Sequence, residues 1–395
     1  MELEAFRKRA WAEVDLDCAE YNFKLIQQQI KSDTKICCVI KANAYGLGAV
    51  ELAREYARLG AGYFAVSNIE EALQLRQSGI VQPILILGYT DTHCASLLSA
   101  NNISQCVFSR EYGEQLSKEA LAQNVEVKVH IKLDTGMGRI GFPCKVEESL
   151  PVDEIASVCR LPRLISEGIF THFASADEGD DGEAYTLQQF KLFMKTVKLL
   201  EKQGVCFAIR HCANSAAIFD FPQTHLDMVR AGIVLYGLRP SQQIHWDGEL
   251  KQVMTLHSIV DHIKEIEPGD YVSYGREYCA DSKRRIATIP IGYADGLWRS
   301  NVSGGIVVKI GAEYAPIVGR ICMDQCMADI TGLKEVHVGS AVTVYGRDEK
   351  ISIDSVADRN HTINYEIMCA LGERIPRAYI RNHRIEKIVD NTLRF

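Results

Sequence analysis

One lysine stands directly after one of the most apolar segments of the chain. Residues 35–40 read KICCVI, and Lys41 is followed by ANAYGLG. The β-branched and sulfur side chains predict a buried strand, and the glycines predict a loop after it. A lysine at the end of a buried strand is costly to leave charged and unpaired. It therefore either pairs with a carboxylate or carries a carbonyl cofactor as an imine.

Two later segments carry groups that can hold an anion. Ser215 follows the strand-like run 207–212, and Gly232 lies within the strand-like run 228–236. A serine hydroxyl and the backbone N–H groups beside a glycine can both approach a phosphate closely. A helix-capping serine and a packing glycine are the structural alternatives. In combination with Lys41, the pattern favours pyridoxal 5′-phosphate as the cofactor, because that cofactor needs both an imine-forming lysine and a phosphate site.

Residues 131–142, IKLDTGMGRIGF, contain three glycines in the spacing G-x-G-x-x-G. This spacing is weak support for a dinucleotide site, because no clear βαβ unit with an acidic residue further on accompanies it. We interpret the segment as a tight loop that directs Arg139 at an anion such as a substrate carboxylate. A surface salt bridge is the alternative interpretation.

The residues above are separated by a regular alternation of strand-like runs and helix-like stretches. The strand-like runs are 35–41, 63–67, 84–88, 104–108, 125–133, 164–173, 207–212 and 228–236. They predict an α/β fold with an N-terminal (β/α)8 TIM-type barrel, and a doubly wound open sheet is the alternative. Phosphate usually binds after strands seven and eight of such a barrel, which is where Ser215 and Gly232 fall.

The alternation stops near residue 245. Strand-like runs punctuated by Gly and Pro follow, which predicts a mainly β C-terminal domain. We therefore divide the chain into a cofactor-binding barrel, 1–245, and a mainly β domain, 246–395. A strand-like run at 9–16 has no place in the barrel, which leaves the later sheet as its candidate partner.

Composition excludes several classes of function. The net charge is −7 and the longest basic cluster has three residues, 283–285, so we expect no nucleic-acid partner. No apolar run approaches the roughly 18 residues that a membrane span needs, and the first residues do not resemble a secretory signal. The 13 cysteines are odd in number, scattered and without a C-x-x-C pair. This pattern predicts no metal site and a reduced, cytoplasmic protein.

Taken together, the motifs resemble those of the alanine racemase family, the fold-type III pyridoxal-phosphate enzymes. The similarity covers essentially the whole chain and rests on nine segments in one order: VIKANAYGLG, KLDTGMGRIGF, THFASAD, ANSAA, MVRAGIVLYGL, SYGREY, IPIGYADG, GRICMDQ and NYEI. Leu47 and Cys212 depart from residues that are frequent in the family. Neither occupies a position to which we assign chemistry.

The resemblance implies a two-base racemase with active sites shared between the subunits of a homodimer. Lys41 would bind the cofactor and exchange the Cα proton of the D-isomer, and Tyr274 of the partner subunit would exchange that of the L-isomer. Further residues would hold the cofactor: Tyr45, Ser215, Gly232, Ile233 and Tyr365 at its phosphate, and Arg230 at its pyridine nitrogen with His172 behind it.

The resemblance also implies a substrate site. Arg139 and the backbone N–H of Met323 would bind the substrate carboxylate. Lys132 matches a position that is carbamylated in several members, where the carbamate orients the arginine. Tyr293, with Asp177 and Arg299, would line the access channel.

The implied activity is the interconversion of L-alanine and D-alanine, which supplies D-alanine for peptidoglycan. A serine or broad-specificity racemase of the same family is the main alternative, and Tyr365 favours alanine because serine-preferring relatives tend to have a smaller residue there. Two more distant possibilities are a barrel-fold decarboxylase and a non-catalytic pyridoxal-phosphate carrier. The segments TGMGR and IGYADG argue against the decarboxylase, and a carrier would have no use for residues 246–395.

Overall fold

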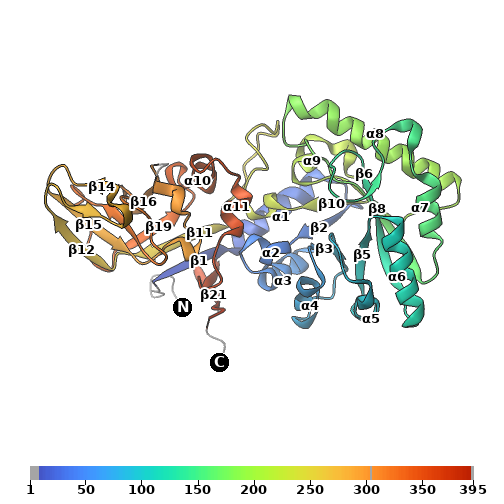
Figure 1. The fold of residues 1–395 in the computed structure, drawn as a ribbon, viewed down its shortest axis with the longest axis horizontal. Coiled ribbons are helices and arrows are strands. Elements are labelled where there is room, and N and C mark those ends of the chain that lie inside the picture. Colours follow the sequence, from blue (N-terminus) through green and yellow to red (C-terminus); the bar gives the residue numbers. More distant parts are fainter. Residues whose placement is uncertain (1–8, 303–304, 393–395) are drawn as a thin grey trace.

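Apolar strands alternate with amphipathic helices along the first part of the chain and build a barrel in the computed structural model, which describes residues 9–302 and 305–392. A second, mainly β region lies beside the barrel (Figure 1). The expectation of no secretory signal concerns the N-terminus, of which residues 1–8 lie outside the described part. Within the described part, no helix is both long enough and apolar enough to span a membrane.

The barrel sheet has the strand order β10-β2-β3-β4-β5-β6-β8-β9 in the described residues, and every neighbouring pair is parallel. Two backbone hydrogen bonds link its ends, from Asp227 N–H to Arg210 O (3.2 Å) and from Arg230 N–H to Ala213 O (3.0 Å). The predicted barrel is therefore confirmed. Its strands are β2 (Lys35–Val39), β3 (Tyr63–Val66), β4 (Ile84–Ile86), β5 (Ile103–Val107), β6 (Val127–Asp134), β8 (Leu164–Phe170), β9 (Ile209–His211) and β10 (Met228–Ala231), and β7 (Phe142–Pro143) pairs with β6.

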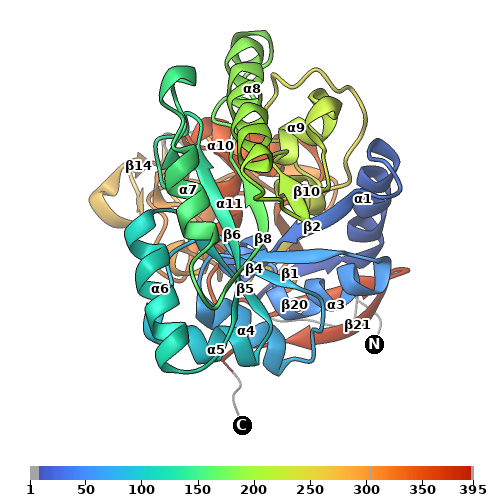
Figure 2. The same ribbon diagram turned by 90° about the vertical axis from the view of Figure 1, so that its right-hand side faces the viewer.

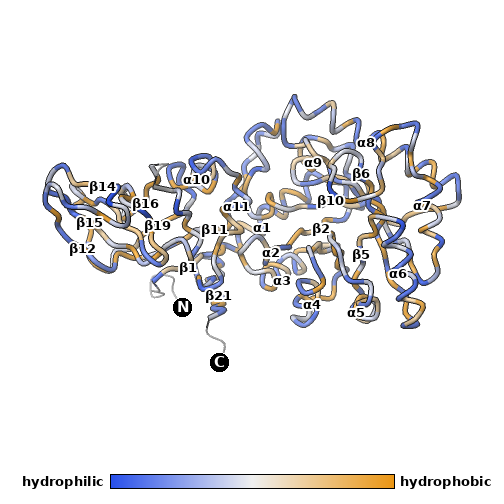
Figure 3. Tube along the Cα trace, viewed as in Figure 1, coloured by the Kyte–Doolittle hydropathy of each residue, from blue (hydrophilic) through white to orange (hydrophobic). Residues whose placement is uncertain are grey.

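Helices surround the strands when the barrel is viewed from its end (Figure 2). They are α1 (Leu16–Gln29), α3 (Ala49–Leu59), α4 (Ile69–Gln77), α5 (Ala95–Ala100), α6 (Arg110–Ala122), α7 (Val152–Cys159), α8 (Asp180–Lys202) and α9 (Ser215–Asp220). Side-chain caps define where several of them begin: Asn68, Ser109 and Asn214 each accept a backbone N–H from the first turn of α4, α6 and α9. Strands such as β2 are apolar, whereas polar and apolar residues alternate along outer helices such as α6 (Figure 3).

Most of the expected strands end earlier than their apolar runs, and two of these ends place residues of interest. The run 35–41 leaves the sheet after Val39, and Lys41 opens the short element α2 (Lys41–Tyr45). The run 228–236 leaves the sheet after Ala231, and Ile233–Tyr236 form a 3₁₀ turn. In both places buried apolar residues continue beyond the strand, so hydropathy alone could not mark the strand end.

The C-terminal region is mainly β, as the sequence predicted. Its largest sheet in the described residues has the order β17 (Glu313–Pro316), β16 (Val307–Ile310), β19 (Ala341–Tyr345), β11 (Met254–Ile259), β1 (Ala10–Asp15), β20 (Arg377–Arg381) and β21 (Arg384–Val389). Smaller sheets join β12 (His262–Ile266), β15 (Arg284–Ile289) and β18 (Cys326–Asp329), and β13 (Tyr271–Val272) with β14 (Tyr278–Cys279). Two helices, α10 (Ile353–Arg359) and α11 (Asn364–Cys369), complete this region.

Strand β1 belongs to the sheet of the C-terminal region and not to the barrel. It pairs antiparallel with β11 and parallel with β20, so the first and last parts of the described chain lie side by side (Figure 1). Helix α1 then carries the chain back to the barrel.

Strand β20 also contacts the turn that follows Lys41. The buried guanidinium of Arg377 donates to Gly46 O through Nε (3.0 Å) and Nη2 (2.8 Å), and Tyr379 Oη donates to Leu47 O (2.8 Å). A Cβ on Gly48 would lie 1.8 Å from Tyr379 Oη, so only glycine fits there. The C-terminal region therefore helps to fix the backbone that carries Lys41.

Candidate active site

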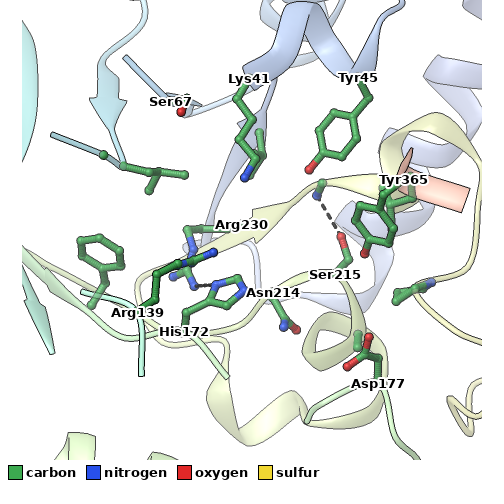
Figure 4. Close-up of a pocket in the computed structure, with 18 of the residues that line it drawn as sticks. Lys41, Tyr45, Ser67, Arg139, His172, Asp177, Asn214, Ser215, Arg230 and Tyr365 are labelled. Atoms are coloured by element: carbon green, nitrogen blue, oxygen red, sulfur yellow. Dashed lines mark hydrogen bonds between the residues drawn. The ribbon is translucent and has the colours of Figure 1, made fainter. Parts of the chain in front are cut away.

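A cavity of about 560 Å³ opens where the barrel strands end at their carboxyl termini. Its lining includes Lys41 after β2, Ser67 after β3, His172 after β8, Ser215 after β9 and Gly232 after β10. Figure 4 shows the side chains of Lys41, Ser215 and His172 converging on this space from different strands. Active sites of (β/α)8 barrels lie at this end of the barrel, because loops from many strands meet there.

The lining of this cavity is strongly cationic. It contains four basic side chains, those of Lys41, Lys132, Arg139 and Arg230, whereas Asp177 is the one carboxylate among the described lining residues. Burial raises the pKa of Asp177. Such a cavity favours an anionic ligand.

Lys41 is presented by an unusual backbone turn. The residues after it, Ala42, Asn43, Ala44 and Tyr45, all have a positive φ between 52° and 55°. Each non-glycine residue in this left-handed region costs roughly 1–2 kcal/mol. Such a turn persists only where the surrounding structure holds it.

A carboxylate and an amide side chain hold the turn. Glu71 on α4 accepts the N–H of Ala42 at Oε1 (2.7 Å) and that of Ser67 at Oε2 (2.7 Å). Asn43 Oδ1 accepts the N–H of Ala49, the first residue of α3 (2.8 Å). Glu71 thereby ties the end of β3 to the turn beside Lys41.

The surroundings of the Lys41 amine favour its neutral form, which is the form that can make an imine. Burial lowers the pKa of its amine, and the nearby positive charge of Arg139 lowers that pKa further. A neutral amine is the form that attacks a carbonyl carbon.

Hydroxyl groups and the backbone of Gly232 lie together at the start of α9 and the end of β10. The N–H of Gly232 donates to Ser215 Oγ (2.9 Å), and a Cβ on Gly232 would lie 2.8 Å from Tyr45 Oη. The rings of Tyr45 and Tyr365 lie 6.0 Å apart, and Tyr365 comes from α11 of the C-terminal region. Burial raises the pKa values of both phenols, so each keeps its proton and can donate it in a hydrogen bond.

Arg230 is buried behind the cavity. Its Nη2 donates to the carbonyl oxygens of Thr171 (2.8 Å) and Cys212 (3.1 Å) and to His172 Nδ1 (3.2 Å), as Figure 4 shows in part. Burial lowers the pKa of the guanidinium to about 10, so it stays charged near neutral pH. Burial and the charge of Arg230 lower the pKa of His172, so that ring is neutral and can accept this hydrogen bond.

Arg139 and Lys132 lie on the side of the cavity formed by β6 and the loop after it. The loop is held by Asp134 Oδ1, which accepts the N–H groups of Gly136 (3.1 Å) and Gly138 (2.9 Å). The Lys132 amine donates to Leu133 O (3.0 Å), and burial lowers its pKa to about 8. Arg139 follows this glycine-rich loop and lines the cavity.

The residues of the cavity fit pyridoxal 5′-phosphate. Because Gly232 has no side chain, Tyr45 Oη and Ser215 Oγ lie close to its backbone, and together with Tyr365 they place three hydroxyl groups at one end of the cavity, where they can donate to an anion. A buried cation, Arg230, offers N–H donors to a ring nitrogen, and a lysine amine completes the set of groups that this cofactor needs. Ile233, beside Gly232, lines the same cavity.

Three residues that we assigned to the site lie elsewhere in the same chain. Tyr274, Tyr293 and Met323 are exposed on the C-terminal region and do not line the cavity. The loops of Tyr293 and Met323 are joined, because Tyr293 N–H donates to Cys322 O (3.0 Å) and Ala294 N–H donates to Met323 O (3.1 Å). The loop of Tyr274 adjoins them, because Ser273 Oγ donates to Arg320 O (2.5 Å). Asp177 lines the cavity, whereas Arg299 does not.

Sequence reasoning did not single out Glu71, Ser67 or Cys369, although the last two line the cavity. Glu71 follows Asn68 in the spacing of a capping box, and that spacing was the available signal. The Glu71 carboxylate accepts the N–H groups of Ala42 and Ser67, whereas a capping box would require it to accept that of Asn68. No local sequence pattern indicates this contact with the turn beside Lys41.

Comparisons with known protein families and with individual proteins agree on one family. A family description named alanine racemase, N-terminal domain, matches residues 14–240, and one named alanine racemase, C-terminal domain, matches residues 253–379. Alanine racemase 1 of Clostridium acetobutylicum is 46% identical over 381 residues, covering 96% of this chain and 97% of that protein.

Solved structures with the same fold include racemases of more than one amino acid. The alanine racemase of Bacillus anthracis with bound L-Ala-P has a TM-score of 0.91 and 37% identity, covering 98% of this chain and 99% of that one. A histidine racemase from Leuconostoc mesenteroides has a TM-score of 0.84 and 30% identity, covering 95% and 99%.

We expect Glu71→Gln to weaken binding of pyridoxal 5′-phosphate by about tenfold, because an amide can accept only one of the two N–H groups and directs its own NH₂ at the other. Fluorescence titration of the cofactor-free protein measures this change. Glu70→Gln is the matched control, since Glu70 is the neighbouring exposed residue on α4. Equal affinities of the two variants would contradict the role of Glu71.

Proposed function

The chain belongs to the alanine racemase family, and we propose that it interconverts L-alanine and D-alanine with pyridoxal 5′-phosphate as cofactor. The observation that carries this proposal is the half-buried amine of Lys41, which faces a cationic cavity opposite Ser215 and Gly232. Full-length similarity to alanine racemases supports alanine as the substrate.

We assign the groups that bind the cofactor from their positions in the cavity. Ser215, Tyr45, Tyr365 and the backbone at Gly232 and Ile233 would hold its phosphate. Arg230 would donate to its ring nitrogen, with His172 against the guanidinium. Because a guanidinium offers donors and keeps its proton, it would leave that nitrogen as an acceptor. When bound, the cofactor supplies an electron sink for the electron pair left at Cα.

The chain itself supplies the proton transfers. Inversion of Cα requires that a proton leaves one face and that another arrives on the opposite face, so a single base would tend to restore the original isomer. Lys41 Nζ would serve one face, and Tyr274 Oη of the partner subunit the other. Arg139 and the backbone N–H of Met323 of the partner subunit would bind the substrate carboxylate.

A homodimer follows from this assignment. Tyr274 is 66% exposed and Met323 is 53% exposed, and neither lines the cavity of its own chain. Tyr293 lies in the same group of loops and is 43% exposed. We propose that these loops close the cavity of a second subunit, where Tyr293 would border the access channel. Exposed aromatic and methionine side chains are typical of such interfaces.

We also propose that Lys132 carries a carbamate. The residue is 3% exposed, and no carboxylate of the described residues lies within 4 Å of its amine. A carbamate would convert this buried cation into an anion beside Arg139, which would fix the guanidinium for the substrate carboxylate.

The biological setting belongs to the same proposal. We propose a cytoplasmic location, because the cysteines of the described chain are all free thiols, as is usual in a reducing compartment. There the enzyme would supply D-alanine for peptidoglycan. Tyr365 narrows the cavity beside the phosphate pocket, which favours a small substrate such as alanine over serine.

The reaction can be tested directly with purified holoenzyme. Starting from pure L-alanine, chiral chromatography should show equal amounts of both enantiomers at equilibrium, because mirror-image molecules have equal free energies. Lys41→Ala should form no D-alanine. If the enzyme releases CO₂ or leaves L-alanine unchanged while the cofactor stays bound, the proposal is wrong.

Mixing two inactive variants tests the shared site. Lys41→Ala and Tyr274→Phe should each lack activity, and subunit exchange between equal amounts should restore about a quarter of the wild-type rate, since half of the dimers then contain one intact site. Mixing Lys41→Ala with the double variant is the control, because no intact site can form. Absence of any recovery after verified exchange would exclude a two-chain site.

Carbamylation of Lys132 should depend on pH. Only the neutral amine adds CO₂, and an amine with a pKa of about 8 is roughly one-tenth neutral at pH 7. At a fixed concentration of dissolved ¹³CO₂, the carbamate signal in ¹³C NMR should therefore grow as the pH rises from about 6 to about 8. Lys132→Arg should give no signal, and a persistent signal in that variant would place the label elsewhere.

A further inference from the structure

A chain of hydrogen-bonded side chains leads from Arg230 into the interior of the barrel, away from the cavity. Arg230 Nη1 lies 3.0 Å from His211 Nδ1, His211 Nε2 lies 2.9 Å from His130 Nδ1, and His130 Nε2 lies 3.3 Å from Glu167 Oε2. Both histidines are fully buried, on β9 and β6, and Glu167 lies on β8. None of these three residues lines the cavity.

The hydrogen bonds of this chain can run in only one direction. A guanidinium has no acceptor, so His211 Nδ1 must carry a lone pair, and its proton is therefore on Nε2. That proton is donated to His130 Nδ1, which leaves the proton of His130 on Nε2, facing Glu167. Burial lowers the pKa values of both imidazoles, in agreement with two neutral rings.

Glu167 ends the chain as an anion. Its Oε2 also accepts hydrogen bonds from Tyr63 Oη (2.8 Å) and Ser104 Oγ (2.9 Å). Burial alone would raise the pKa of this carboxyl, but the hydrogen bonds from His130 and Tyr63 outweigh it and lower the pKa to about 2. Arg230, in contrast, has no carboxylate of the described residues within ion-pair distance.

Neighbouring residues of the barrel strands fix the positions of the His130 and His211 rings. A Cβ on Gly168 would lie 2.4 Å from His130 Nδ1, so the glycine allows the ring to lie against β8. The ring of His211 stacks on Phe170 at 4.8 Å with an interplanar angle of 6°. Both imidazoles are therefore held in fixed orientations, which a hydrogen-bonded chain of tautomers requires.

We propose that Glu167 is a positioning residue for Arg230, acting through His130 and His211 as its hydrogen-bonded counter-charge. The inference rests on the proposed function in assigning Arg230 to the cofactor ring. With the anion in place, both tautomers are fixed and Arg230 always meets an acceptor at His211. Without it, the opposite tautomers become available, and His211 Nδ1–H would then oppose Arg230 Nη1–H.

The substitution Glu167→Gln removes the negative charge of Glu167 while keeping the size and shape of its side chain. Glu167→Gln can offer its NH₂ group to His130 Nε2 and thereby reverse both tautomers. In the holoenzyme we expect a changed absorbance spectrum of the bound cofactor and a kcat lowered by about tenfold, with the KM for alanine within about twofold of wild type. Gly168→Ala should produce the same spectral change by displacing the His130 ring while Glu167 keeps its charge.

Nitrogen NMR reads the tautomers independently of activity. In histidine-labelled wild-type holoenzyme, His211 and His130 are recognised by the coupling across their shared hydrogen bond, and both should be neutral with the proton on Nε2. Glu167→Gln should alter these shifts. Lys128→Met is the matched control, because Lys128 Nζ approaches Glu167 Oε1 (3.9 Å) from the partly exposed side, and it should leave shifts, spectrum and kcat unchanged.

A cationic ring or a proton on Nδ1 of either histidine in the wild type would overturn the proposal. So would wild-type shifts and wild-type kcat in Glu167→Gln. A wild-type enzyme with the expected shifts but no racemisation would instead refute the proposed function and leave the tautomer chain standing.

Discussion

The central constraint on this structure is that four positive charges gather around one cavity at the end of an apolar barrel, where two of them, Lys132 and Arg230, are buried. Lys41, Lys132, Arg139 and Arg230 surround one cavity with a single carboxylate, Asp177, among its described lining residues. Removing cations from water costs several kcal/mol each unless they are paired or hydrogen-bonded. An anionic cofactor offsets part of this cost in the native state alone, so cofactor binding and stability are necessarily linked. The cavity is in this sense built for a ligand, and its most strained backbone, the turn after Lys41, lies at the same place.

Neutral groups accept the hydrogen bonds that the Arg230 guanidinium makes within the chain. Arg230 is surrounded by backbone carbonyls and neutral histidines, which accept hydrogen bonds without becoming bases that compete for its proton. A direct carboxylate partner would cancel the positive potential that the ring nitrogen experiences. Placing the negative charge of Glu167 beyond two imidazoles keeps the guanidinium oriented while the cavity remains cationic.

The sequence predicted the features that depend on local patterns. Apolar runs and their spacing predicted the barrel, and Lys41, Ser215 and Gly232 follow its strands as that fold requires. The left-handed turn was not predictable, because Ala42–Tyr45 contain no glycine and Glu71 holds them from another helix. Strands β20 and β21 were missed because RAYIR and RIEKIV are rich in charge, and they form by pairing with the distant β1 and with each other. Glu167, His130 and His211 are each unremarkable in sequence, and only barrel closure brings them together.

The remaining feature is the separation of the two assigned proton-transfer groups onto different regions of the chain. The Lys41 turn is held by Arg377 and Tyr379 of β20. The loops of Tyr293 and Met323 are held by the buried Asp295, which accepts the N–H of Gly292 (2.9 Å) and the guanidinium of Arg374 (2.7 Å), while Arg374 also binds Asp324 (2.6 Å). Side-chain hydrogen bonds within one chain therefore hold the backbone beside Lys41 and the loops of Tyr293 and Met323. In the proposed homodimer, the distance between the two proton-transfer groups would then be set by how two subunits dock, so the dimer interface would itself be a determinant of the chemistry.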